Sequence, residues 1–240
     1  MDEAVQDASQ ANGWQLVKLA DLFVQYGQDA AVERMMDEKA RQEMYSTYAE
    51  WLKNHYVAKN NLLAALEMAE LIFHKRPWFE EYQKMRELAR QLGNWEVVRQ
   101  GALTFLETTH NTSTLVEVAL DEGNIERALQ LLEATKPQSI EGYQWKYDYA
   151  LAPKIALTAA ERGEEAYPRA SIDLYQQYVE RLITEHGRSN YQVACNYLVK
   201  IRSLYEKLDE TEQWILYIAL LRKRYSRLRT LKEELAAVGL

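Results

Sequence analysis

The sequence predicts an all-α protein, a tetratricopeptide-like α-solenoid of antiparallel helical hairpins, and three observations support this fold class. The 240 residues include only 9 Gly and 4 Pro, about half of average usage, and they are rich in helix-forming Leu, Ala, Glu, Arg and Gln. No run of alternating β-branched residues between turn signals predicts a strand. The third observation is a turn mark that recurs at a nearly constant spacing. We therefore expect at least ten helices and no sheet.

The turn mark is a Gly or Asn that follows one apolar helical stretch and precedes the next. Its four regular positions are Gly27, Asn60, Gly93 and Gly123, with steps of 33, 33 and 30 residues. Gly and Asn are the residues that most readily close a helix in the left-handed conformation. A period near 33 residues is typical of helical hairpins that bury their apolar faces by stacking. Later marks at Gly163 and Asp209 are wider apart and predict longer hairpins.

Other residues place the ends of individual helices. Pro77, Pro153 and Pro168 are expected in first turns, and Thr112 or Ser113 can cap the helix that follows. No Gly-, Ser- or Pro-rich linker divides the chain. We therefore predict a flexible N-terminus over residues 1–13 and a single solenoid domain over residues 14–240. Its regular repeats would cover about 14–135, and its longer hairpins about 137–240.

Three stretches also resemble a known family. They are "AALEMAELIFHKRPWFEEYQKMRELARQLGNWEVVRQGAL", "LVEVALDEGNIERALQLL" and a last block that ends in "LRKRYSRLRTLKEELAAVGL". Their order is similar to that in the helical C-terminal half of bacterial SWIM zinc-finger proteins, over roughly residues 60 to 240. That finger binds zinc through Cys-x-Cys and Cys-x-His motifs, which this sequence lacks. The resemblance thus implies a helical interaction region without the zinc site.

The sequence contains no motif for catalysis or for a cofactor. Phosphate-binding Gly-rich loops are missing, and none of the four His has a second His or Cys at ligand spacing, so each is expected at the surface or at a helix end. Cys195, the single cysteine, is expected to be a buried structural thiol. The longest apolar run is too short to span a bilayer, and the acidic start is unlike a signal peptide. We predict a cytoplasmic protein that is not an enzyme and has no cofactor, no metal and no membrane contact.

The first candidate binding surface is aromatic. In "EGYQWKYDYAL", Tyr143 and Tyr147 would share one face of a helix, and Trp145 would lie on another with Tyr149. These rings pack in the core, or at least one of them lines a groove and contacts a peptide. Both alternatives stay open at this point.

The second candidate surface is basic. Arg222, Arg224 and Arg227 lie in "LRKRYSRLR", and the residues from Arg188 onward carry a net charge of +4 within a chain of −7. Such asymmetry can indicate nucleic-acid binding. However, a helix with a buried stripe at Trp214, Leu221, Leu228 and Leu235 would spread these charges around it. A solvated face, or a docking site for the acidic N-terminal part of the chain, is the competing interpretation.

These observations predict a protein-interaction scaffold that binds a peptide or partner protein on a concave helical surface. The alternative is a nucleic-acid-associated module that uses the basic C-terminal helix. The sequence leaves the partner and the oligomeric state open.

Overall fold

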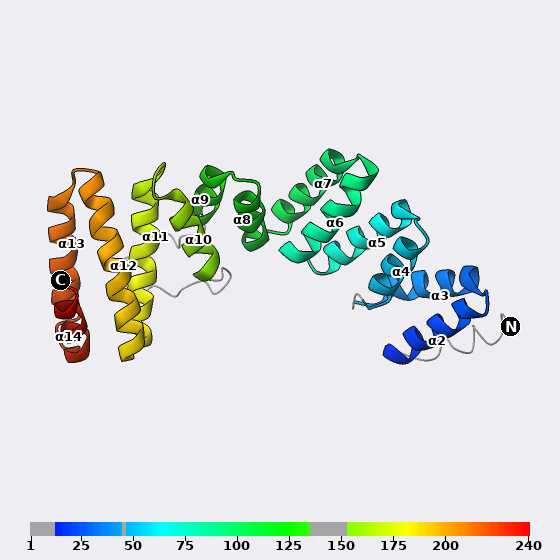
Figure 1. Cartoon of the computed structure of the whole chain (residues 1–240), viewed down its shortest axis with the longest axis horizontal. Helices are drawn as coiled ribbons and strands as arrows, with labels where there is room; N and C mark the ends of the chain where they lie inside the picture. Colours follow the sequence, from blue (N-terminus) through cyan, green and yellow to red (C-terminus); the bar gives the residue numbers. More distant parts are fainter. Residues whose placement is uncertain (1–12, 45–46, 135–152) are drawn as a thin grey trace. The chain divides into compact units, whose positions relative to one another are not determined.

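The structure, a computed structural model, describes residues 13–44, 47–134 and 153–240, and all regular secondary structure in these ranges is helical. The described ranges contain thirteen α-helices (Figure 1), which confirms the predicted all-α helical-repeat fold. The chain divides into two compact units, Met1–Thr114 and Leu115–Leu240. Each unit is described by itself below, and the prediction of one continuous solenoid over residues 14–240 stays a prediction. Residues 1–12, most of the predicted flexible N-terminus, lie outside the described residues.

The first unit consists of consecutive helices, most of which pack on their neighbours in sequence. The contacts between α4 and α5 and between α5 and α6 are the most extensive. The helices are α2 (Trp14–Gln25), α3 (Asp29–Gln42), α4 (Thr47–Ala58), α5 (Leu62–Lys75), α6 (Phe79–Leu92), α7 (Trp95–Thr108) and the start of α8 (Thr112–Asp121).

The second unit contains the two longest described helices, α11 with 18 residues and α12 with 20, in the region where the marks are more widely spaced. Its dominant contact joins α11 and α12, which lie side by side in Figure 1. The unit contains the rest of α8, then α9 (Ile125–Ala134), α10 (Pro153–Gly163), α11 (Pro168–Glu185), α12 (Arg188–Lys207), α13 (Thr211–Arg224) and α14 (Arg229–Ala237).

One turn geometry recurs where helices end. Nine described residues have φ between 53° and 76°, and for seven of them the next amide N–H donates to the carbonyl four positions before the left-handed residue, at 2.8 to 3.1 Å. This is the Schellman closure of a helix. The residues are Gly27, Asn60, Gly93, His110, Gly123, Asp209 and Gly239.

An Asn often follows the left-handed residue and begins the next helix. The side-chain oxygens of Asn61, Asn111 and Asn124 each accept from the amide three residues later, at 3.0 to 3.3 Å. Two adjacent residues thus close one helix and cap the next. The predicted left-handed marks at positions 27, 60, 93 and 123 are confirmed.

Some predicted boundaries differ in detail. Pro153 and Pro168 begin α10 and α11 as expected, whereas Pro77 lies two residues before α6. Asn111, rather than Thr112 or Ser113, caps α8.

Gly163 does end α10, but without a positive φ, so it serves close packing. A Cβ at this position would lie 2.9 Å from Ser171 Oγ on α11. The small residue therefore allows α10 and α11 to approach each other.

Each unit has its own apolar core. In the first unit one cluster joins α2 to α5 and includes Leu16, Met36 and Tyr48. In the second unit a cluster extends from α8 to α14 and includes Cys195, whose burial confirms the prediction for that thiol. Burial raises the Cys195 pKa to about 11, so the neutral thiol dominates at neutral pH. None of the described helices is both long and apolar enough to cross a membrane.

Candidate functional site

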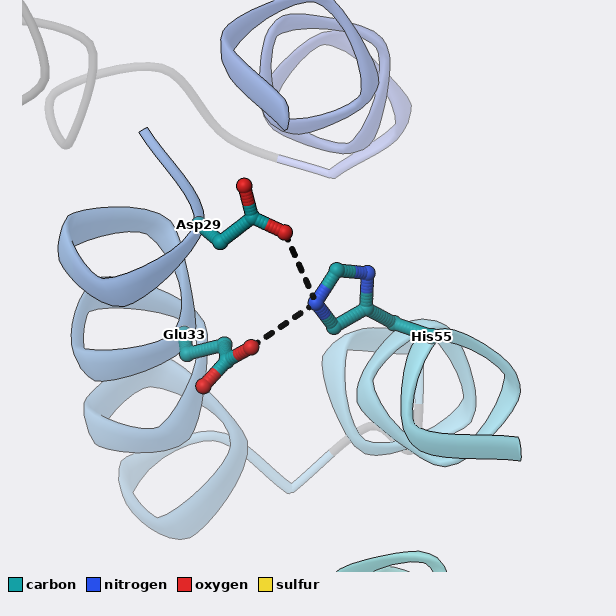
Figure 2. Close-up of side chains that lie close together, drawn as sticks. All are labelled: Asp29, Glu33 and His55. Carbon is teal, nitrogen blue, oxygen red and sulfur yellow. Dashed lines mark hydrogen bonds and ion pairs between the residues drawn. The ribbon is translucent and has the colours of Figure 1, made fainter. Parts of the chain in front are cut away.

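Four charged or polar side chains from two helices meet in the first unit, and we call them the α3–α4 cluster. Asp29 and Glu33 lie one turn apart on α3. His55 lies in the last turn of α4, and Lys59 directly follows that helix, with its amide N–H donating to the His55 carbonyl at 3.1 Å. Side chains four residues apart share a helix face, so each helix presents two groups to the other. Figure 2 shows both carboxylates pointing toward the imidazole of His55.

The distances define a network of ion pairs. Lys59 Nζ lies 2.5 Å from Asp29 Oδ1 and 2.9 Å from Glu33 Oε1. His55 Nε2 lies 2.9 Å from Glu33 Oε1 and 3.9 Å from Asp29 Oδ1. Because a carboxylate only accepts hydrogen bonds, we assign the hydrogen to His55 Nε2, which donates it to Glu33.

The electrostatics agree with this network. Hydrogen bonding to Lys59 lowers the pKa of Asp29. For Glu33, burial opposes ionisation, but the hydrogen bonds from Lys59 and His55 outweigh it and lower the pKa. The two carboxylates in turn raise the pKa of Lys59. Both acids and the lysine are therefore charged at neutral pH.

A second layer of contacts holds His55 in place. Its side chain is only 9% exposed, and its ring stacks on Trp51 with a centroid distance of 4.8 Å and an interplanar angle of 12°. The Trp51 indole N–H donates to Asp21 on α2 at 2.7 Å. This series of contacts links α2, α3 and α4 through polar groups beside the apolar core.

The cluster has the donor types of a metal site. One ligand atom from each of Asp29, Glu33 and His55 lies within 4.8 Å of the others, and one imidazole with two carboxylates can coordinate Zn²⁺. However, the Lys59 ammonium already contacts both carboxylates, and the assigned hydrogen on Nε2 points at Glu33. A metal would have to displace the lysine and move that hydrogen. The geometry therefore favours a closed ion-pair network that ties α3 to α4.

His55 lies in the last turn of α4, as the expectation of a surface or helix-end position allows, but its side chain is mostly buried. Its partners come from a different helix, 22 and 26 residues earlier, so ligand spacing within one helix could not reveal them. The sequence feature that could have indicated the cluster is the four-residue spacing of Asp29 and Glu33 and of His55 and Lys59, which places the two side chains of each pair on one helix face.

The predicted aromatic surface lies outside the described residues, because Tyr143, Trp145 and Tyr147 fall within 135–152. Both alternatives for these rings stay predictions.

The predicted basic residues are described, and they do not form one group. Arg224 pairs with Glu180 at 2.8 Å, whereas Arg222 and Arg227 are exposed and have no ion-pair partner among the described residues. The expected single helix is wrong, since α13 ends at Arg224 and α14 begins at Arg229. Leu228 lies in the connection between them and is only half-buried.

A further exposed feature is the turn between α5 and α6, which presents an indole. Trp78 is 57% exposed, and the Arg76 guanidinium lies over its ring, 5.0 Å from the centroid. Arg76 is fixed by Glu50 and Glu81 at 2.8 and 2.6 Å. Sequence reasoning did not identify this pair, because the exposure of a Trp beside a helix start depends on tertiary packing.

The turn itself is held by the following hairpin. The Pro77 carbonyl accepts hydrogen bonds from the Asn111 side-chain amide at 3.0 Å and from the Thr114 hydroxyl at 2.6 Å. Trp78 is thus an exposed aromatic side chain on a fixed backbone.

Comparison with known proteins gives little guidance on function. No family model matches the chain. A stretch of 68 residues is 44% identical to part of an uncharacterized protein, YwqB, from Bacillus subtilis (strain 168). The match covers 28% of this chain and 13% of that protein.

Proposed function

We propose that this chain is a protein-interaction scaffold that binds an apolar segment of a partner protein at the Trp78 turn. The observation that carries the proposal is the exposed Trp78 indole against Arg76, next to a Pro77 carbonyl held by Asn111 and Thr114. Trp and Arg are enriched among residues that dominate binding energy. A side chain that is already fixed loses little conformational entropy when a partner binds.

The charges around the turn indicate the chemistry of the partner. Arg76 already has two carboxylate partners, Glu50 and Glu81, so it has little need of an acidic group from outside. The indole face offers apolar area and a cation–π contact that is already made. An apolar or aromatic side chain of the partner therefore suits this surface better than an anion. The proposal also agrees with the helical interaction region that the resemblance to SWIM proteins implies.

The test compares three forms of the chain. The wild-type chain is used to isolate a binding protein from the source cells, and that protein is then purified and titrated by calorimetry. We expect Trp78→Ala to weaken binding by about 30-fold, equivalent to about 2 kcal/mol for an aromatic hot spot, with little change in thermal stability. Val97→Ala is the matched control, because Val97 is 78% exposed on α7 in the same unit.

Two outcomes would contradict this proposal. One is unchanged binding by the Trp78→Ala chain. The other is a loss of binding that only follows a loss of folded protein, which would make the indole a structural group.

A second candidate function is nucleic-acid binding through the C-terminal basic residues. Arg222 and Arg227 favour it, because both are exposed and neither is neutralised by a carboxylate among the described residues. Phosphate contacts make affinity fall steeply with salt. Retardation of random duplex or single-stranded DNA at low salt, lost at high salt and in an Arg222→Ala, Arg227→Ala chain, would support this function over the first.

A further inference from the structure

Helix α13 has apolar side chains on two opposite faces. Its inner face, with Trp214, Ile218 and Leu221, is buried, and the helix packs chiefly on α12, beside it in Figure 1. Its outer face carries Ile215, Leu216 and Leu220, which are 57%, 65% and 63% exposed.

None of the other described helices carries three exposed large apolar side chains. The exposed face of α6, for example, consists of Glu80, Lys84, Glu87 and Gln91 at helical spacing. A surface helix normally has one apolar stripe, toward the core, and a polar opposite face. Adjacent exposed aliphatic residues in a rim of charge indicate a contact surface.

The outer stripe is symmetric in sequence. Its members are spaced by 3, 1, 3, 1 and 3 residues, so the spacing is the same when the helix is read backwards. At 100° per residue all of them fall within about 140° of the helix circumference. The stripe consists of Glu212, Ile215, Leu216, Ala219, Leu220 and Lys223, all exposed.

We propose that the outer stripe of α13 binds the same stripe of a second copy of this chain, with the two helices antiparallel. A two-fold axis would pass between Tyr217 and Ile218 in sequence. Glu212 of each copy then faces Lys223 of the other, Ile215 faces Leu220, and Leu216 faces Ala219. A two-fold contact must be self-complementary, and this stripe meets that condition in both charge and apolar character.

Charge disfavours the parallel arrangement. In that register Glu212 would face Glu212 and Lys223 would face Lys223, and like charges oppose association. Neither side chain has an ion-pair partner among the described residues of its own chain, so both are free to pair across the contact. Arg224, by contrast, is held by Glu180 and lies outside the stripe.

The length of the stripe sets the expected affinity. Eleven residues of rise correspond to about 17 Å of helix, which is short for a contact that must bury about 800 Å² per partner in a stable dimer. The dimer is therefore weak, with a dissociation constant in the micromolar range. It forms and dissociates as the concentration of the chain changes.

Sedimentation equilibrium of the full chain tests the proposal, over about 1 to 500 µM to bracket such an affinity. We expect a reversible monomer–dimer equilibrium. Leu216→Glu should raise the dissociation constant at least tenfold, because it places a carboxylate in the apolar centre of the contact. Val97→Glu is the matched control, since it adds the same charge to an exposed apolar position in the other unit and should leave the constant unchanged.

A charge exchange tests the antiparallel register. Glu212→Lys alone and Lys223→Glu alone should each weaken the dimer by several-fold, and the double variant should restore it, because opposite charges then face each other again. Residues 212, 216 and 223 are all exposed, so circular dichroism should show the same fold in every variant.

Several results would overturn the proposal. They are a monomer at every concentration, a dimer insensitive to Leu216→Glu, and a double charge variant as weak as the single ones. Since none of these variants alters Trp78, the proposed partner-binding function would stand or fall separately.

Discussion

The recurring left-handed turn makes a prediction that can be tested in both directions. Gly93 has φ 72° and ψ 14°, and His110 has φ 53°. In both turns the following Asn amide donates to the carbonyl four positions before the left-handed residue, at 3.1 and 2.9 Å. Gly93→Ala adds a side chain to this geometry, and His110→Gly removes one from it.

The structure allows the magnitude to be estimated. No atom lies within 4 Å of a Cβ built on Gly93, so the substitution creates no clash with a neighbouring group. What remains is the cost of the left-handed conformation, about 1–2 kcal/mol. The more restricted unfolded chain offsets about 0.4–1 kcal/mol of this cost. Gly93→Ala should therefore lower the free energy of unfolding by about 1 kcal/mol, and His110→Gly should raise it by a similar or smaller amount by the same principles.

Urea titration followed by circular dichroism measures both changes on chains of identical length. In a protein of this size about 1 kcal/mol also corresponds to roughly 2–4 °C in the melting temperature. If Gly93→Ala were as stable as wild type, or His110→Gly were clearly less stable, the turn conformation would not be what selects these residues. The physical basis of the 33-residue period would then be lost.

Two further predictions concern packing and charge. Gly163→Ala should destabilise the second unit by about 1–3 kcal/mol through overpacking, because its Cβ would meet Ser171 Oγ at 2.9 Å; adding Ser171→Ala should recover part of the loss in urea titration. Glu33→Gln should lower the melting temperature at neutral pH. The pKa of Glu33 is lower in the folded chain than in the unfolded chain, so the ionised carboxylate stabilises the fold at pH values above the unfolded pKa. This stabilisation is lost as the pH falls through the folded pKa. The difference from wild type should therefore shrink in melting curves taken from pH 7 down to pH 3, and a constant difference would show that the Glu33 charge is not involved.

Local signals in the sequence predicted most of the helix junctions. A left-handed helix end needs Gly or Asn for reasons confined to one residue, so Gly27, Asn60, Gly93 and Gly123 could be identified without a structure. His110 has the same conformation but was not among the predicted marks. There the local preference is weaker, and the surrounding hydrogen bonds of Asn111 fix the turn.

The groups that make up candidate sites were harder to predict, because each depends on contacts between helices. His55 shows nothing unusual in its own segment, and its role follows from α3 packing on α4. The connection at residues 225–228 broke a seven-residue pattern that looked continuous in the sequence. Trp214, Leu221 and Leu235 are buried as expected, but they belong to two helices rather than one.

The α3–α4 cluster and the stripe on α13 illustrate what separates a structural group from a binding group in this protein. Asp29, Glu33, His55 and Lys59 satisfy one another, so the cluster has no remaining need that an outside molecule would meet. Residues 215, 216 and 220 keep large apolar areas in water, which is unfavourable by roughly 25 cal/mol for each Å². Glu212 and Lys223, at the two ends of the same stripe, have no ion-pair partner among the described residues. A binding role is therefore better sought where apolar side chains are exposed and charged side chains lack an ion-pair partner, as on α13. It is less expected where donor atoms lie close together but already pair with one another, as in the α3–α4 cluster.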